Sequence, residues 1–195
     1  MKVPPGGEQW CHQLKLDGWR LQAVKVGAKV ALFTRGGNDI SGRLPEITAA
    51  VRSLPCRSAR IDSELALPVS GGFDFYGLQR AAKRRQSHDV ALFAFDLLER
   101  DGKDLRRLPL LERQKRLGRL LIRSASPCLH LVESFPNGEA LLLACERFGL
   151  EGIVSKRLDM PYVSGPSKYW RKIKTKIWKE RNQTRWKIFQ DYSAS

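Results

Sequence analysis

The sequence predicts a single α+β domain in which short strands alternate with short helices. Three observations support this class. The 195 residues are 42% hydrophobic, which suits one globular core that needs no disulfide or metal to hold it together. Apolar runs of strand length alternate with segments whose apolar residues recur at helical spacing. The chain shows no internal repeat, no low-complexity segment and no linker.

The first half of the chain opens with a predicted β-hairpin. Residues 21–34 alternate apolar and polar side chains around Gly27-Ala28, as strands joined by a tight turn do. Pro45 starts a helix that runs to Leu54, where Pro55 stops it. Residues 59–67 form the next strand, and residues 68–72 are rich in turn formers.

The second half continues the alternation. A basic helix is expected over residues 76–86, followed by a buried apolar strand over residues 90–98 that ends at a turn over residues 100–102. Helical spacing returns at residues 110–122. Asn137 caps a further helix over residues 138–148, which Gly149 ends. Residues 152–155 are a strand.

Composition excludes several classes of protein. No run of about 18 apolar residues is present, so a membrane-spanning helix is excluded, and the first residues lack the apolar core of a signal peptide. The four cysteines stand far apart without a Cys-x-x-Cys pair, which excludes zinc-ribbon and thioredoxin-like sites. We therefore expect a cytoplasmic protein with reduced thiols and no membrane partner.

The charge points to a polyanionic partner. The net charge is +15 and the pI is near 10.1. Residues 168–187 hold nine Lys and Arg against the single acid Glu180. The alternative is a solvated basic tail, which Trp170, Trp178 and Trp186 argue against. Their even spacing of eight would place them on one face of an extended strand. The basic strip is thus either a last strand or an appendage.

Six short segments carry polar residues where packing alone would not place them. If Leu14 and Leu16 face a core, Lys15 lies on the opposite side with Gln13 and Asp17. Singly, each segment would be an ordinary turn, surface or core feature. The six segments, in chain order, are Lys15-Leu16-Asp17-Gly18-Trp19-Arg20, Arg35-Gly36-Gly37, Asp62-Ser63-Glu64, Phe93-Ala94-Phe95-Asp96, Glu151-Gly152-Ile153-Val154-Ser155-Lys156 and Trp170-Arg171-Lys172-Ile173-Lys174.

In this order the segments resemble the nucleotidyltransferase motifs of the ATP-dependent DNA ligases, a family that includes RNA ligases and mRNA capping enzymes. The family pattern Lys-x-Asp-Gly-x-Arg matches Lys15 to Arg20. Two positions differ, because the family commonly has Asn where Gly37 stands and Gly where Ser63 stands. Residues 95–113 look most like bacterial ligases of the DNA ligase D type, which serve end-joining repair. The resemblance runs from Trp10 to Thr175.

The resemblance implies a nucleotidyltransferase (ATP-grasp-like) fold, built from antiparallel sheets flanked by helices in a single domain over residues 1–175. Residues 176–195 would be a basic C-terminal extension. Only 20 residues follow Thr175, too few for the five-stranded OB-fold that such ligases normally carry.

The implied reaction is attack of Lys15 on the α-phosphorus of ATP to give lysyl-AMP, transfer of AMP to the 5′-phosphate of a DNA nick, and sealing by the 3′-hydroxyl. An unperturbed lysine, with a pKa of about 10.4, is protonated at neutral pH and cannot attack. Nearby cations and burial lower such a pKa; the expected neighbours are Lys172, Lys174, Arg20 and Mg²⁺.

The resemblance also assigns the remaining site residues. Phe95, or less readily Phe93, would stack on adenine. The implied nucleotide contacts are Gln13, Arg20, Arg35, Glu64, Phe95, Lys156, Lys172 and Lys174, the metal ligands are Glu64 and Glu151, and the DNA contacts are Arg20, Arg35, Lys176, Lys179 and Arg181.

The expected partners are ATP, Mg²⁺ and nicked double-stranded DNA, with end-joining or repair proteins supplying further domains to a monomeric chain. Two alternatives stay open. An RNA ligase-like nucleotidyltransferase would share the lysine chemistry, and a degenerate relative would bind nucleic acid without catalysis.

Overall fold

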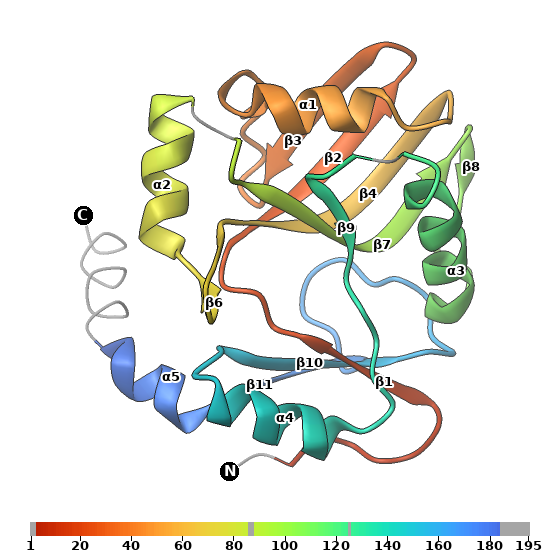
Figure 1. Cartoon of the computed structure of the whole chain (residues 1–195). Helices are drawn as coiled ribbons and strands as arrows, with labels where there is room; N and C mark the ends of the chain where they lie inside the picture. The colour runs from red at the N-terminus through yellow and green to blue at the C-terminus, as the bar shows by residue number, and fades with distance from the viewer. Residues whose placement is uncertain (1–2, 86–87, 125, 184–195) are drawn as a thin grey trace.

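The computed structural model describes residues 3–85, 88–124 and 126–183, and two separate sheets dominate it (Figure 1). The larger sheet has the antiparallel order β3-β2-β4-β7-β8, and β9 pairs in parallel with β7. Its strands are β2 (Trp19–Val26), β3 (Lys29–Thr34), β4 (Ser58–Ala66), β7 (Ala91–Arg100), β8 (Lys103–Asp104) and β9 (Leu129–Leu131). A small ribbon, β5 (Pro68–Val69) and β6 (Gly72–Phe73), lies beside it.

The smaller sheet joins the two ends of the chain. Its antiparallel order is β1-β10-β11, with β1 (Trp10–Leu14), β10 (Gly152–Arg157) and β11 (Trp170–Lys174). The register sets Gln13 opposite Val154, and Val154 opposite Lys172. The central strand therefore holds the amino-terminal and carboxy-terminal motif segments at fixed positions on either side of it.

Helices cover the outer faces of both sheets. The helices are η1 (Ser41–Arg43), α1 (Pro45–Arg52), α2 (Phe75–Arg84), α3 (Leu110–Leu121), α4 (Gly138–Arg147) and α5 (Lys176–Arg181). Side chains cap several of them, as in α2, where Asp74 accepts from the Gly77 amide, and α4, where Asn137 accepts from the Ala140 amide.

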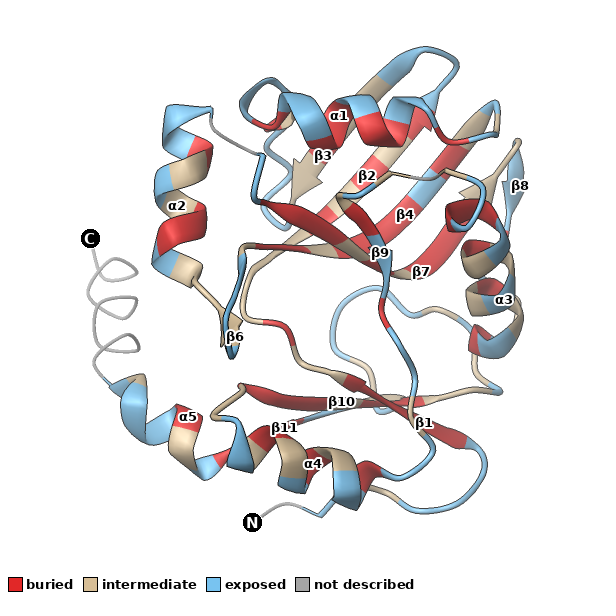
Figure 2. Ribbon diagram, in the orientation of Figure 1, coloured by how far each residue is buried: buried red, intermediate tan, exposed pale blue. Residues whose placement is uncertain are grey.

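Each sheet has its own hydrophobic core (Figure 2). The larger core lies between the six-stranded sheet and α1, α2 and α3, with fully buried residues such as Ile47, Leu78 and Leu117. The smaller core packs Leu142 and Cys145 of α4 against Ile153 and Ile173. Because the helices occupy the outer faces, the inner faces of the two sheets remain for a site between them.

These findings confirm the α+β class, the antiparallel sheets flanked by helices, and the helices and strands expected between residues 21 and 155, with ends that shift by a few residues. The strand β1 is missing from the sequence prediction. Four of its five residues are buried, so the apolar and polar alternation of a half-exposed strand is absent there. The short strands β8 and β9 were also missed.

The carboxy-terminal segment contains both a strand and a helix. Trp170 lies on β11 and Trp178 on α5, so no single extended strand carries both rings, and the basic strip supplies the last described strand and a helix after it. Thr175 ends the strand and caps the helix by accepting from the Trp178 amide. Trp186 and the basic residues beyond 183 lie outside the described residues. The division of the chain at residue 175 stays a prediction.

The structure bears on two expectations from composition, the absence of a membrane-spanning helix and the reduced state of the cysteines. None of the helices in the described ranges has both the length and the apolar character that a bilayer crossing requires. All four cysteines are free thiols, with Cys11 and Cys145 buried.

A buried ion pair joins α3 to the larger sheet. The guanidinium of Arg113 donates to both carboxylate oxygens of Asp96, at 2.7 and 2.9 Å, and both side chains are fully buried. Arg113 also donates to the carbonyls of Leu108 and Met160. Arg113 therefore connects helix α3 to strand β7 and to the loop that follows β10.

We predict that Arg113→Leu lowers the free energy of unfolding by about 3–5 kcal/mol, because it leaves the Asp96 carboxylate buried without its partner. Chemical denaturation measures this change. Arg106→Leu is the matched control, since Arg106 pairs with Asp104 on the surface and its loss should matter little. Equal effects from the two substitutions would contradict the prediction.

Candidate active site

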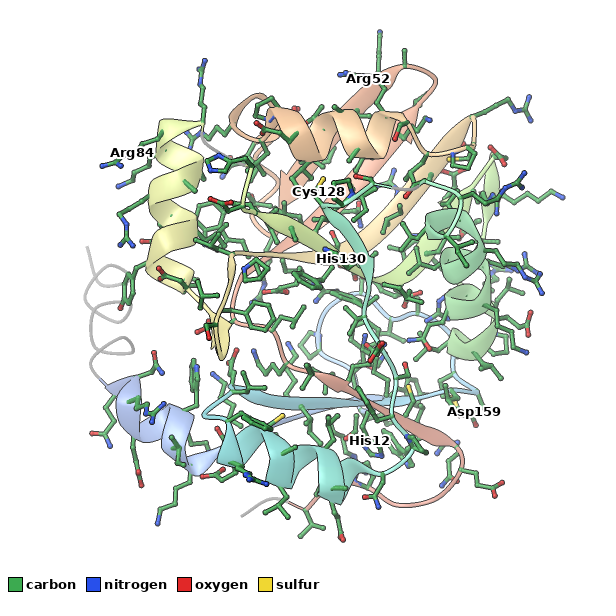
Figure 3. All side chains as sticks on the ribbon, in the orientation of Figure 1. His12, Arg52, Arg84, Cys128, His130 and Asp159 are labelled. Carbon is green, nitrogen blue, oxygen red and sulfur yellow. The ribbon has the colours of Figure 1, made fainter. Side chains whose placement is uncertain are left out.

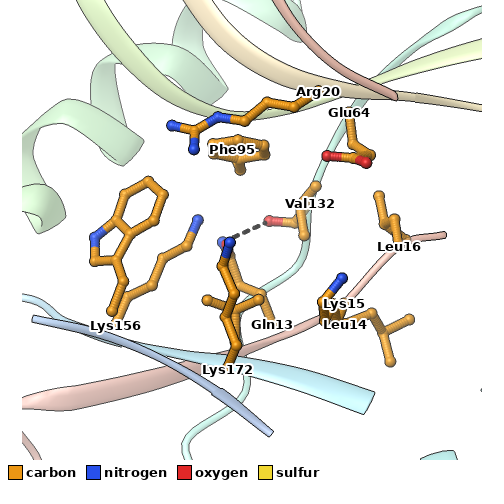
Figure 4. Close-up of a pocket in the computed structure, with 12 residues that line it drawn as sticks. Gln13, Leu14, Lys15, Leu16, Arg20, Glu64, Phe95, Val132, Lys156 and Lys172 are labelled. Carbon is orange, nitrogen blue, oxygen red and sulfur yellow. Dashed lines mark hydrogen bonds between the residues drawn. The ribbon is translucent and has the colours of Figure 1, made fainter. Parts of the chain in front are cut away.

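A pocket opens between the inner faces of the two sheets (Figure 4). It contains about 510 Å³ of space not filled by atoms, open solvent included. Both sheets contribute to it. The lining residues are Gln13, Leu14, Lys15, Leu16, Arg20, Glu64, Phe95, Val132, Val154, Lys156, Trp170 and Lys172.

The segment of Lys15 is held by backbone contacts. The Lys15 amide donates to the carbonyl of Gly152 at 2.8 Å, which extends the pairing of β1 with β10 by one residue. Gly18 then brings the chain against β4, where an added Cβ would lie 2.1 Å from the carbonyl oxygen of Leu65. Only glycine fits there, so the Asp-Gly of the motif has a steric cause.

One carboxylate oxygen joins the two lysine motifs. Glu151 Oε1 lies 2.7 Å from Lys15 Nζ and 3.0 Å from Lys174 Nζ. Glu151 is 5% exposed, and the side chains of both lysines are about one-fifth exposed. Gly152 has φ +141°, and an added Cβ would lie 2.0 Å from the carbonyl oxygen of Ile173. This glycine lets β10 start close to β11, with Glu151 between the two lysines.

Further cations surround this cluster. Burial lowers the pKa of Lys172, and the positive charges of Lys15 and Arg20 lower it further. Burial also lowers the pKa of Lys174, against the opposing effect of Glu151. Lys15 thus lies among charges of both signs, with Lys172 and Lys174 as cations and Glu151 and Glu64 as carboxylates.

Glu64 faces the same space from the larger sheet. Burial raises its pKa to about 7, with Lys15 acting in the opposite direction and Glu151 adding to the rise. Within the described residues no hydrogen bond or ion pair reaches the Glu64 carboxylate.

Hydrogen bonds to Asp62 and Tyr162 hold the Arg20 side chain in place. It donates to Asp62 through two hydrogen bonds of 3.0 and 2.6 Å, and to the Tyr162 hydroxyl at 3.2 Å. Tyr162 in turn donates to Asp62 at 2.9 Å. Sequence reasoning gave Asp62 no role and missed Tyr162 altogether. Tyr162 lies in the loop between β10 and β11, where no strand or helix pattern pointed to it.

Phe95 reaches the pocket from a β-bulge. The pairing of β4 with β7 shifts register between Asp62 and Ser63, which leaves Phe95 without an opposite residue. Its ring lies edge-on to Trp170, and Lys156 Nζ lies 4.1 and 4.2 Å from the two ring centroids. Burial lowers the pKa of Lys156 to about 8.

Phe93 is directed elsewhere. Its ring stacks on His130 of β9 at 5.1 Å and meets Phe73 edge-on, and none of the three residues lines the pocket. His130 is labelled in Figure 3. Of the two aromatic residues that the sequence offered for stacking, the pocket contains Phe95 alone.

Gln13 forms part of the pocket wall and is 2% exposed. Its amide nitrogen donates to the carbonyl of Val132 at 3.3 Å and to the hydroxyl of Ser134 at 3.0 Å (Figure 4). Since a carbonyl only accepts, these bonds fix which end of the amide remains for a ligand.

Six of the predicted site residues lie outside the pocket lining. Two of them, Glu151 and Lys174, belong to the charge cluster of Lys15, and the other four are Arg35, Lys176, Lys179 and Arg181. Arg35 is exposed at the end of β3, close enough for its charge to lower the pKa of Lys172. Gly37 follows with φ +83°, a conformation that Gly and Asn both adopt readily, so the difference from the family pattern has little steric cost. The three basic residues of α5, Lys176, Lys179 and Arg181, are all exposed.

The comparisons with known proteins agree with this architecture. Residues 5–174 match the family model described as ATP dependent DNA ligase domain. The multifunctional non-homologous end joining protein LigD of Pseudomonas aeruginosa is 36% identical over 182 residues, which are 92% of this chain and 22% of that protein.

Two solved structures are similar over most of the chain. The ligase domain of M. tuberculosis LigD has a TM-score of 0.73 at 28% identity, over 87% of this chain and 54% of that one. A mycobacterial DNA ligase D complexed with ATP and MES has a TM-score of 0.72 at 27% identity, over 88% and 58%.

This chain thus spans less than a quarter of the P. aeruginosa relative and a little over half of each solved chain. The family match extends over nearly all of its described residues, through both sheets and every motif of the pocket. The chain belongs to the ATP-dependent DNA ligase domain family.

Proposed function

We propose that this chain is the adenylating domain of a DNA ligase, with residues 1–175 as the catalytic domain and residues 176–195 as a basic extension. Lys15 attacks the α-phosphorus of ATP to form lysyl-AMP and release pyrophosphate. The AMP then passes to the 5′-phosphate of a DNA nick, and the 3′-hydroxyl displaces it to seal the strand. The observation that carries this proposal is the Lys15 amine, which contacts Glu151 beside Lys174 and lines a pocket together with Arg20, Phe95 and Lys172.

Lys15 has to lose its proton before it attacks. Glu151 Oε1, at 2.7 Å, is the nearest acceptor for that proton. Lys172, Lys174 and Arg20 would stabilise the negative charge of the transferring phosphoryl group.

The rest of the pocket suits adenosine. Phe95 offers a ring face on which adenine would stack, Gln13 offers an amide oxygen, and Val154 lines the wall between them. Lys156 and Arg35 are candidate contacts to phosphate or ribose. A solved relative complexed with ATP supports this choice of nucleotide.

Mg²⁺ fits the donor set of this pocket. No group of three or more His, Cys, Asp or Glu with metal-site geometry occurs in the described part of the chain, but Mg²⁺ in nucleotide sites usually takes one or two carboxylates and completes its shell with phosphate and water. Glu64, whose carboxylate has no direct partner within the described residues, and Glu151 would hold it. When bound, the ion would neutralise charge on the triphosphate.

The substrate and partners follow from the same chemistry. Nicked double-stranded DNA would lie along Arg20, Arg35 and the exposed basic residues of α5, through phosphate contacts that carry little sequence information. A ligase has to act on any sequence, so this mode suits the task. We expect a monomer that acts in the cytoplasm, with end-joining or repair proteins as partners.

We predict that the purified protein takes an acid-labile covalent label from ATP labelled in the α-phosphate. Lys15→Ala should abolish the label, because no other amine has the same neighbours, and Lys29→Ala should keep it, because Lys29 is exposed at a hairpin. Gel analysis after incubation with Mg²⁺ measures this. The Lys15→Ala variant should still seal nicks that are already adenylated.

The outcomes separate the alternatives. Wild-type protein that takes no label and leaves adenylated nicks open would support the non-catalytic binding module. Labelled protein that seals RNA nicks in preference to DNA nicks would support the RNA ligase-like enzyme.

We predict opposite effects of Glu64→Gln on stability and on labelling. Because the pKa of Glu64 is raised to about 7 in the folded state, its ionisation above that pH costs folding free energy, while below its ordinary pKa the two states are protonated alike. The variant should therefore unfold at higher denaturant than wild type at about pH 8, and at a similar concentration at about pH 4. Its labelling by ATP should fall. Glu139→Gln, at an exposed carboxylate, is the control; a similar pH pattern there would count against the assignment.

We predict that replacing Lys176, Lys179 and Arg181 by Gln weakens DNA binding and flattens its salt dependence. The slope of log affinity against log salt should fall by roughly 0.9 for each phosphate contact that is lost. Fluorescence anisotropy with nicked DNA at several salt concentrations measures it. A control variant with Lys29, Lys103 and Lys115 replaced loses equal charge at exposed positions on other elements. An equal change in both variants would place the DNA elsewhere.

A further inference from the structure

We propose that Trp178 is a positioning residue for lysine adenylation: from helix α5 it holds the loop that carries Lys15 in its reactive geometry. This inference rests on the proposed function, since it concerns the same lysine. Sequence analysis read Trp178 only as part of a basic strip, and no motif of the family resemblance includes it.

Helix α5 has a fixed place beside the smaller sheet. The Thr175 hydroxyl donates to the carbonyl of Leu150 at 2.7 Å. The carboxylate of Glu146, on α4, accepts from the backbone amides of Lys176 and Ile177 at 2.9 and 3.0 Å. The first turn of α5 is thus bonded to α4 and to the turn before β10, which begins next to Glu151 (Figure 1).

Trp178 reaches the reactive cluster from this anchored helix. Its indole N–H donates to Asp17 Oδ2 at 3.3 Å, and Lys174 Nζ lies 4.2 Å from the centroid of its ring. The side chain is 7% exposed. Trp178 therefore contacts both Asp17, which lies two residues from Lys15, and Lys174, which shares the Glu151 oxygen with Lys15.

The segment on which it acts is short and already constrained. Leu16 is buried, and Gly18 lies against the Leu65 carbonyl. Between these two fixed residues, the Asp17 side chain connects the segment to helix α5. A bond from Asp17 to a rigid helix limits rotation of the segment two residues from the Lys15 amine. Small errors of position at a nucleophile cost large factors in rate.

Trp178→Phe tests this directly, because it keeps an aromatic ring beside Lys174 and removes the N–H donor together with part of the ring. In single-turnover labelling with ATP and Mg²⁺, the plateau reports the active fraction and the rate constant reports the chemistry. We expect the rate constant to fall by roughly three- to tenfold, the scale of one hydrogen bond. The plateau and the ATP concentration at half-maximal rate should change little, since adenine binds elsewhere in the pocket.

Two further variants exclude a merely structural role. Glu180→Gln, on the same helix and outside the site, should label like wild type. In the background of Asp17→Ala, Trp178→Phe should cause no further fall in the rate constant, because the contact through which it acts is already gone.

The outcomes are distinct. A lower plateau with an unchanged rate constant, or fully additive effects of the two substitutions, would overturn the positioning role and leave the proposed function standing. Failure of the wild-type protein to take any label would overturn the proposed function itself and this inference with it.

Discussion

The arrangement of this site depends on one shared oxygen atom. Glu151 Oε1 accepts from the amines of Lys15 and Lys174, which come from opposite ends of the chain. The three-stranded sheet brings them together, because Gly152 pairs with Lys174 on one side and receives the amide of Lys15 on the other. Without the carboxylate, two ammonium groups would face each other at this edge of the sheet with no negative charge between them.

The second sheet turns this charge cluster into a pocket. Arg20 and Glu64 stand opposite each other on β2 and β4, and the bulge at Phe95 adds an aromatic face on the next strand. Asp62 and Tyr162 fix the Arg20 guanidinium, so the positive charges are oriented before any ligand arrives. Burying charged groups in this way costs folding free energy. The raised pKa of Glu64 and the lowered pKa of Lys156 reflect that cost, because burial disfavours the charged form of each.

Much of this could be predicted from the sequence, for physical reasons that differ by element. Helices with proline or asparagine at their starts, such as α1 and α4, have local signals, and so do strands with clear apolar runs. The motif order identified the lysines, glutamates and Phe95 that lie in the pocket or in the charge cluster beside it. Strand β1 could not be found, since it is buried on both faces. Tyr162 and the Trp178 contact with Asp17 depend on tertiary packing across 100 and 161 residues, and no local pattern encodes them.

The central claim is that the Lys15 amine becomes bonded to AMP. Peptide mapping by mass spectrometry, after incubation of the intact protein with ATP and Mg²⁺ under conditions that preserve the phosphoramidate, tests it most directly. We expect AMP on the peptide that contains Lys15. Modification of Lys172, Lys174 or Lys156 in its place would contradict the assignment of the nucleophile.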